Sequence, residues 1–228
     1  MEILLDTANI ETIKKYEAIL PLAGVTTNPS IIKKEGEIDF FAHMKKISEI
    51  IGKQCSLHVQ VVAKDKAGML KDAKKILEQL GEETYLKIPL SPEGLKTIKS
   101  LKKEGFNVTA TAIYTKFQAY LAVAAGADYI APYYNRMENL NIDAKEAIAA
   151  MAHEIDRSNS QTKIVAASFK NIGQVTTALE QGAQAVTVAP DIIEQALAMP
   201  SISQAVDDFA KDWETIFGKG STMADLHD

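Results

Sequence analysis

The feature that most constrains the fold is an alternation, along the whole chain, between short β-rich runs and longer amphipathic runs. The short runs are rich in Val, Ile, Thr and Tyr and are bounded by Gly, Pro or Asn, which is typical of strands. The eight candidate strands are Glu2–Thr7, Gly24–Asn28, Gln54–Val62, Thr84–Leu90, Phe106–Ile113, Ala127–Tyr134, Thr162–Phe169 and Ala183–Ala189. Eight strands, each followed by a helical segment, predict an α/β protein with a single (β/α)8 TIM barrel. A doubly wound open sheet stays open as the alternative, because alternation does not establish closure.

The helical segments carry start and stop signals that agree with this interpretation. Ser91 followed by Pro92 predicts a helix start, and Thr115 with Gln118 predicts a capping box. Four glycines follow apolar-periodic runs and predict helix ends before strands: Gly81, Gly105, Gly126 and Gly182.

The end of the chain is surplus to eight βα units. We expect residues 1–205 to form the barrel and residues 206–228 to form a last helix and a polar tail. Phe209, Trp213 and Phe217 are spaced four apart and share one face of this helix. Two locations are open for that face, its own barrel or a neighbouring subunit.

Composition excludes several classes of protein. The net charge of −5, without a cluster of Lys and Arg, argues against nucleic-acid binding. The chain has neither a signal-peptide pattern at its beginning nor a run of about 18 apolar residues, so we expect no membrane span. Its single cysteine, Cys55, forms no intramolecular disulfide, which favours a reducing cytoplasm.

Polar side chains recur near the carboxyl ends of the predicted strands, where a barrel has its active site. Lys87 lies in mid-strand between Leu86 and Ile88. A buried ammonium is costly unless it is paired or neutral, and desolvation lowers its pKa toward that of an amine nucleophile. The polar residues at comparable depth are Asp6, Asn28, Gln60, Thr109, Thr111, Tyr133, Arg136 and Ser168. A lysine among such groups is suited to Schiff-base chemistry on a carbonyl substrate.

Metal and nucleotide cofactors find little support. Of the four histidines, His43 and His153 fall on predicted helices, His227 lies in the tail and His58 lies on a strand, so none has ligand spacing. We expect His58 to be a core histidine. The chain has neither a GxGxxG fingerprint nor a P-loop, so we expect no cofactor and no metal.

Five motifs resemble those of the transaldolase family, in particular its small members. They are LDTA at 5–8, LAGVTTNPS at 22–30, LKIP at 86–89, APY at 131–133 and AASF at 166–169. The resemblance spans the chain from the first strand to the last helix. It implies a (β/α)8 barrel that uses class I aldolase chemistry without a metal.

The resemblance also implies roles for single residues. Lys87 is similar to the Schiff-base lysine, and Asp6 to the carboxylate that assists proton transfer. The residues implied in binding are Asn28 and Ser168 for the donor and Arg136 for the substrate phosphate. Ser168 has the phosphate as an alternative partner.

Two positions resemble the aldolase branch of the family rather than the transaldolases. Gln60 stands where transaldolases commonly have Glu, and Tyr133 stands where they commonly have Phe. The Tyr133 phenol can donate or accept a proton, whereas Phe cannot. Together with Gln60 and Thr111 it could hold a water that carries protons to and from the reacting atoms.

The implied function is reversible cleavage of fructose 6-phosphate to dihydroxyacetone and glyceraldehyde 3-phosphate. One alternative is a transaldolase, which transfers a dihydroxyacetone unit between sugar phosphates of the pentose phosphate pathway. A third is a non-catalytic barrel that binds sugar phosphates. The resemblance further implies a homo-oligomer, a pentamer or decamer, with the last helix at a subunit contact.

Overall fold

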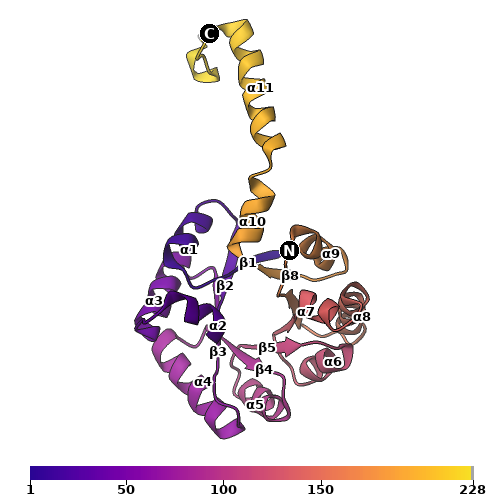
Figure 1. Cartoon of the computed structure of the whole chain (residues 1–228). Coiled ribbons are helices and arrows are strands. Elements are labelled where there is room, and N and C mark those ends of the chain that lie inside the picture. The colour runs from indigo at the N-terminus through magenta and orange to yellow at the C-terminus, as the bar shows by residue number, and fades with distance from the viewer. Residues whose placement is uncertain (227–228) are drawn as a thin grey trace. The chain divides into compact units, whose positions relative to one another are not determined.

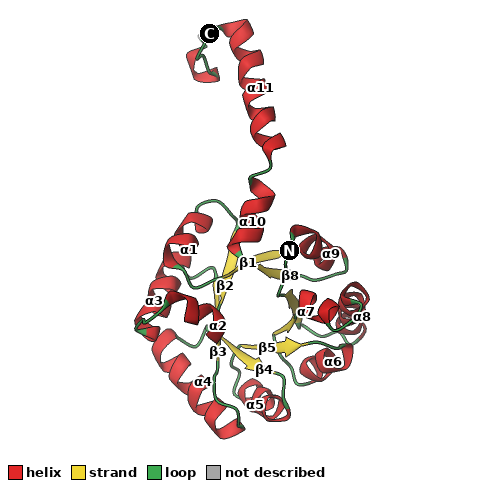
Figure 2. Cartoon of the chain, in the orientation of Figure 1, coloured by secondary structure: helices red, strands yellow, loops and turns green. Residues whose placement is uncertain are grey.

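The computed structural model describes residues 1–226 and divides into two compact units, Met1–Pro190 and the segment from Asp191 onward. The first unit is a closed barrel of eight parallel strands in sequence order, in which β8 (Ala185–Val188) pairs back to β1 (Glu2–Asp6). Figures 1 and 2 show the strands as an inner ring, with helices around the outside. The predicted barrel is confirmed, and closure excludes the open sheet.

All eight predicted strands are present, most of them shorter than expected. The other six are β2 (Leu22–Thr26), β3 (Ser56–Gln60), β4 (Tyr85–Pro89), β5 (Val108–Ile113), β6 (Tyr129–Pro132) and β7 (Lys163–Ala166). Several predicted strands extend beyond the carboxyl ends of the observed strands. Asn28, Tyr133 and Ser168 therefore lie in loops or at helix starts, which corrects their predicted place in strands.

Helices α1 to α9 and one 3-10 turn belong to this unit. They are α1 (Ile10–Glu17), α2 (Pro29–Ile32), η1 (Lys33–Glu35), α3 (Phe40–Ile51), α4 (Lys66–Leu80), α5 (Pro92–Lys103), α6 (Lys116–Ala124), α7 (Tyr134–Asn139), α8 (Ala144–Arg157) and α9 (Ile172–Glu180). The predicted signals are confirmed: Ser91 caps α5, Thr115 and Gln118 form a reciprocal capping box, and the four predicted glycines have positive φ. The short helices α2 and α7 were not expected.

The barrel interior below the carboxyl ends is packed with apolar and aromatic side chains. Leu4, Tyr129, Ala131, Val165 and Ala185 form one buried cluster. The ring of His58 packs edge to face against Tyr129 of this cluster, with ring centres 5.3 Å apart.

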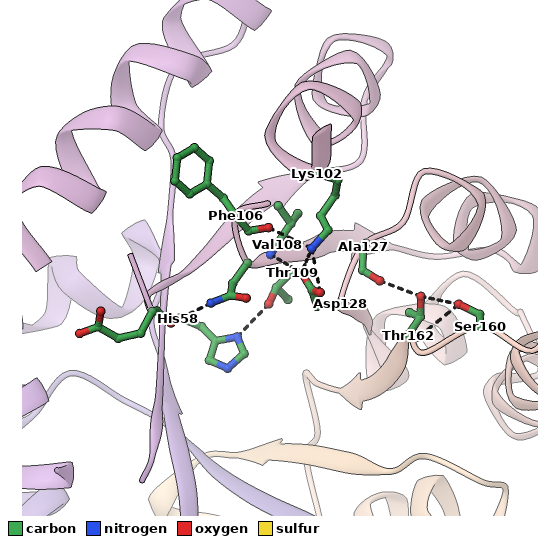
Figure 3. Close-up of polar contacts among 11 residues, drawn as sticks. His58, Lys102, Phe106, Val108, Thr109, Ala127, Asp128, Ser160 and Thr162 are labelled. Atoms are coloured by element: carbon green, nitrogen blue, oxygen red, sulfur yellow. Dashed lines mark hydrogen bonds and ion pairs between the residues drawn. The ribbon is translucent and has the colours of Figure 1, made fainter. Parts of the chain in front are cut away.

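His58 is fully buried and makes two hydrogen bonds, which confirms that it is a core histidine. Its Nδ1 lies 2.8 Å from Thr109 Oγ1 (Figure 3), and its Nε2 lies 2.9 Å from Ser56 Oγ. Because Ser56 Oγ donates to the carbonyl oxygen of Ala23, it accepts from Nε2, and Nδ1 then accepts from Thr109. The imidazole thus bridges β3 to β5 across β4.

An ion pair fixes the start of β5 and β6 on the outside of the barrel. Lys102 of α5 lies 2.6 Å from Asp128, and its Nζ also donates to the carbonyl oxygen of Phe106 (Figure 3). Asp128 accepts in turn from the backbone N–H of Val108 at 2.7 Å. These bonds hold α5 against the strand ends, so that the register of β5 and β6 is anchored at their amino ends.

Helix α5 also lies directly on the end of β4. A Cβ on Gly94, in the first turn of α5, would be 1.9 Å from the carbonyl oxygen of Pro89. Only glycine allows this approach, because real Cβ contacts are never that short. The close packing fixes the carboxyl end of the strand that carries Lys87.

The second unit contains most of α10 (Pro190–Leu197), together with α11 (Pro200–Phe217) and η2 (Met223–Asp225). Helix α11 begins at Pro200, before the expected residue 206, because proline is favoured in the first turn of a helix. Apolar side chains on α11 are exposed at Ile202, Val206, Phe209, Ile216 and Phe217. No helix in residues 1–226 is long and apolar enough to cross a membrane. His227 lies outside the described residues.

Candidate active site

Lys87 occupies the middle of β4, with 5% of its surface exposed. Its neighbours in register are Gln60 on β3 and Thr109 on β5, so it faces the barrel interior between two polar side chains. Burial lowers the pKa of the Lys87 ammonium from its ordinary value of 10.5, and the negative charge of Asp6 only partly opposes this. The amine therefore loses its proton more readily than a surface lysine does.

Asp6 ends β1 and is held by two threonines. Its Oδ1 accepts a hydrogen bond of 2.7 Å from Thr26 Oγ1, which lies 2.5 Å from Thr187 Oγ1. Since Thr26 donates to Asp6, it accepts from Thr187. Burial raises the pKa of the Asp6 carboxyl, while the charge of Lys87 and the Thr26 hydrogen bond act in the opposite direction.

Sequence reasoning gave no role to Thr26 or Thr187. The signal available was their position: both are polar residues inside short β-rich runs. The structure buries both, with Thr26 beside Asp6 in register and Thr187 beside Leu4, so Thr26 orients the carboxylate directly and Thr187 acts through Thr26.

Thr111 and Tyr133 meet at the boundary between β5 and β6. Their hydroxyl oxygens are 2.9 Å apart. The pairing of β5 with β6 is irregular between Ala110 and Ile113, where Ala112 adopts a left-handed φ of 59°. Tyr133 follows β6 directly, and its backbone N–H donates to the carbonyl oxygen of Ile113 at 3.0 Å. Burial raises the pKa of the Tyr133 phenol, so it is protonated and able to donate.

Gln60 ends β3 beside Lys87. Its Oε1 is buried and has no hydrogen-bond partner among the described residues. A buried carbonyl oxygen without a partner is costly, so this atom is suited to accept a hydrogen bond from a ligand hydroxyl.

Asn28 caps α2 immediately after β2. Its Oδ1 accepts from the backbone N–H groups of Ser30 at 2.9 Å and Ile31 at 3.0 Å. The cap fixes the side chain and occupies its oxygen, so the amide nitrogen is the group with which Asn28 can contact a ligand.

Ser168 lies two residues after β7 in a left-handed conformation, with φ of 63°. Its carbonyl oxygen accepts from the backbone N–H of Asn135 at 2.9 Å, which ties it to α7. Such a conformation costs a non-glycine residue about 1–3 kcal/mol and is concentrated at functional sites.

Arg136 lies in α7 with its guanidinium exposed at the rim. Its Cζ is 4.6 Å from the centre of the Tyr133 ring, and its Nη1 donates to the hydroxyl of Tyr114 at 3.3 Å. Sequence reasoning missed Tyr114, which directly follows β5 and carried no motif signal.

The predicted residues converge on one end of the barrel. The charges of Lys87 and Arg136 both act on the Asp6 carboxyl, as does that of Lys34 in η1, which was also missed. Cations thus gather around an acidic side chain at the mouth, an arrangement that suits an anionic ligand. The described side chains of His, Cys, Asp and Glu form no group of three that could hold a metal.

The fold and the site define a (β/α)8 barrel built around a buried lysine. The model of the family described as transaldolase/fructose-6-phosphate aldolase matches residues 3–226. The chain belongs to this family. It is 58% identical over 216 residues to a probable fructose-6-phosphate aldolase from Streptococcus pneumoniae, which covers 95% of this chain and 97% of that protein.

Proposed function

We propose that the protein is a class I aldolase that reversibly cleaves fructose 6-phosphate to dihydroxyacetone and glyceraldehyde 3-phosphate. The observation that carries the proposal is the burial of Lys87, which lowers its pKa in a setting of hydroxyl, amide and carboxyl groups. The match to the family and the printed name of the Streptococcus pneumoniae relative support the same activity.

The covalent steps belong to Lys87. Its neutral amine adds to the C2 carbonyl of the open-chain ketose, and loss of water gives an iminium. The positive nitrogen draws the electrons of the C3–C4 bond while the C4 hydroxyl loses its proton. Glyceraldehyde 3-phosphate leaves, and an enamine remains on Lys87. Protonation at C3 and addition of water release dihydroxyacetone and restore the amine.

Tyr133 and Asp6 serve the proton transfers. The Tyr133 phenol is hydrogen-bonded to Thr111, so its orientation is fixed. With the buried Oε1 of Gln60 the two hydroxyls supply donors and acceptors for a water that relays protons. Asp6, whose pKa is raised by burial, exchanges a proton more easily near neutral pH than a surface aspartate does.

The remaining residues bind the substrate. Asn28 and Ser168 hydrogen-bond the hydroxyls of the donor half. Arg136 binds the phosphate, because the edge of a guanidinium matches two phosphate oxygens. Lys87 is buried and Arg136 is exposed, which suits a ketose whose carbonyl lies inside the barrel and whose phosphate stays at the rim.

The transferase alternative differs in the fate of the enamine. A transaldolase keeps it until an aldose phosphate accepts it, whereas a lyase protonates it. The Tyr133 phenol is the group that favours protonation, and Gln60 adds no charge beside Lys87. We therefore favour the lyase.

Incubation with fructose 6-phosphate alone separates the two activities. The proposal expects free dihydroxyacetone in catalytic excess over enzyme, measured with an enzymatic assay for the triose. Turnover that begins only after erythrose 4-phosphate is added would overturn the proposal in favour of transfer. The Lys87→Met variant, which keeps the side-chain volume, serves as the control and is expected to release none.

We further propose that the protein works in the cytoplasm as a homo-oligomer, a pentamer or decamer. A single half-buried cysteine supports a reducing compartment. The exposed apolar side chains of α11 support a subunit contact, in which Trp213 and Phe217, 4.3 Å apart between ring centres, take part.

A further inference from the structure

We propose that Tyr114 is a positioning residue that sets the preference for phosphorylated substrates, by holding the Arg136 guanidinium against the Tyr133 ring. The inference rests on the proposed function, since it takes Arg136 as the phosphate-binding group. Neither the motifs nor the family match assigns a role to Tyr114.

Three contacts link the three side chains. The Tyr114 hydroxyl accepts a hydrogen bond from Arg136 Nη1 at 3.3 Å. The Arg136 guanidinium carbon lies 4.6 Å from the centre of the Tyr133 ring, which is the distance of a cation–π contact. The rings of Tyr114 and Tyr133 meet edge to face, with centres 5.5 Å apart and planes at 83°. The guanidinium of Arg136 is therefore held at its edge by Tyr114 and on its face by Tyr133.

Tyr114 is itself fixed by its neighbours. Its backbone N–H donates at 2.8 Å to Oε1 of Gln118, which belongs to the capping box of α6. On the other side, the backbone N–H of Tyr133 donates to the carbonyl oxygen of Ile113, the residue before Tyr114. The two tyrosines are thus anchored to one another through the backbone as well as through their rings.

Holding Arg136 in this way matters because the side chain is exposed. A free arginine side chain loses rotamer entropy when it is ordered on a ligand. The contacts with Tyr114 and Tyr133 order it beforehand. One N–H group is used on Tyr114, and the guanidinium keeps other donors for phosphate oxygens.

The test compares two acceptors that differ only in the phosphate. Dihydroxyacetone is condensed with glyceraldehyde 3-phosphate or with glyceraldehyde, and KM and kcat are measured for each. Tyr114→Phe removes the hydroxyl and keeps the ring. We expect the KM for glyceraldehyde 3-phosphate to rise about threefold to tenfold, the size of one ordinary hydrogen bond, with kcat unchanged. The KM for glyceraldehyde is expected to stay the same.

Two controls separate positioning from a general structural effect. Tyr120→Phe makes the same chemical change on α6, outside the candidate site, and is expected to alter neither KM. In an Arg136→Gln background, Tyr114→Phe is expected to have no further effect, because the guanidinium that it positions is gone.

Three results would overturn the inference: an unchanged KM for glyceraldehyde 3-phosphate, an equal rise with both acceptors, or a full effect that persists without Arg136. Binding of inorganic phosphate, measured by calorimetry, makes this failure distinguishable from a failure of the proposed function. Weaker phosphate binding by Tyr114→Phe supports the inference even if the unmodified protein condenses neither acceptor, an outcome that would overturn the aldolase alone.

Discussion

The hydroxyl of Tyr133 lies 2.9 Å from the hydroxyl of Thr111, at the point where β5 leaves its regular pairing with β6. The irregularity has a local cause, because Ala112 adopts a left-handed φ of 59° directly after Thr111. A single hydrogen bond therefore orients two proton-carrying groups, one from β5 and one from the residue that follows β6. In the proposed reaction these two groups handle the protons for Lys87.

Removal of the Tyr133 hydroxyl tests its part in the reaction. General acid–base groups contribute about 10²–10⁴ to rate, so Tyr133→Phe is expected to lower kcat for fructose 6-phosphate cleavage by at least about 10². Thr111→Val removes the partner hydroxyl and keeps the shape, and a loss of about tenfold is expected because Tyr133 keeps its phenol. Steady-state kinetics give both values. Equal losses in the two variants would contradict a direct role of Tyr133.

The activity is expected to depend on the protonation of Lys87. Only the neutral amine attacks a carbonyl, and burial lowers the pKa of Lys87 below 10.5. The value of kcat/KM should therefore rise with pH through a midpoint below 10.5 and then level off. Because Asp6 raises the pKa of Lys87 electrostatically, Asp6→Asn is expected to move this midpoint to lower pH, whatever it does to the maximum rate. A midpoint that moves upward in Asp6→Asn would contradict this electrostatic relationship.

His58 is expected to make stability depend on pH. Burial lowers its pKa from 6.5 to about 3, so the unfolded chain binds more protons between these values. The contribution of neutral His58 to the free energy of unfolding is fully present above pH 6.5. It is lost as the pH falls toward 3, by at most about 1.4 kcal/mol per pH unit. Urea unfolding at a series of pH values measures this slope.

His58→Phe is the matched variant, because it keeps a ring at this position without a titrating group. At neutral pH it is expected to be less stable by about 1–3 kcal/mol, since the hydroxyls of Thr109 and Ser56 lose their buried partner. The difference in free energy of unfolding between this variant and the unmodified protein should become smaller as the pH falls. Parallel stability curves for the two proteins would show that folding does not lower the pKa of His58.

The exposed apolar side chains of α11 form a stripe along the helix, which leads to a prediction about assembly. The stripe consists of Ile202, Val206, Phe209, Ile216 and Phe217. Phe209→Asp places a charge in the middle of the stripe, and we expect it to lower the molar mass measured by light scattering. Ser203→Asp adds the same charge to an exposed position that is not on the stripe, and it serves as the control. An unchanged mass in Phe209→Asp would show that α11 does not hold subunits together.

The fold was predictable because each βα unit carries its own local signals. The β-rich runs, the Ser91 cap, the capping box at Thr115 and the terminal glycines all specify elements without reference to distant residues. The alternation of strands and helices did not predict that the barrel closes, because closure depends on the pairing of β8 with β1.

The site residues were predictable only where a residue type is unusual for its local sequence. A lysine between Leu86 and Ile88 is conspicuous in a strand, and Lys87 is indeed buried. Tyr114 and Thr187 could not be found in this way, because Tyr and Thr are ordinary strand residues and their roles arise from contacts with other βα units. Strand ends were misjudged at Tyr133 and Ser168 because the backbone turns there to reach the mouth.

The most direct test of the central claim is to trap the covalent intermediate. The protein is incubated with dihydroxyacetone and sodium borohydride, digested, and its peptides are analysed by mass spectrometry. We predict one reduced adduct, dihydroxyacetone joined through C2 to Nζ of Lys87, and its absence from Lys87→Met. Recovery of the Lys87 peptide only in its unmodified form would contradict the account. So would full activity of Lys87→Met with the adduct on another lysine.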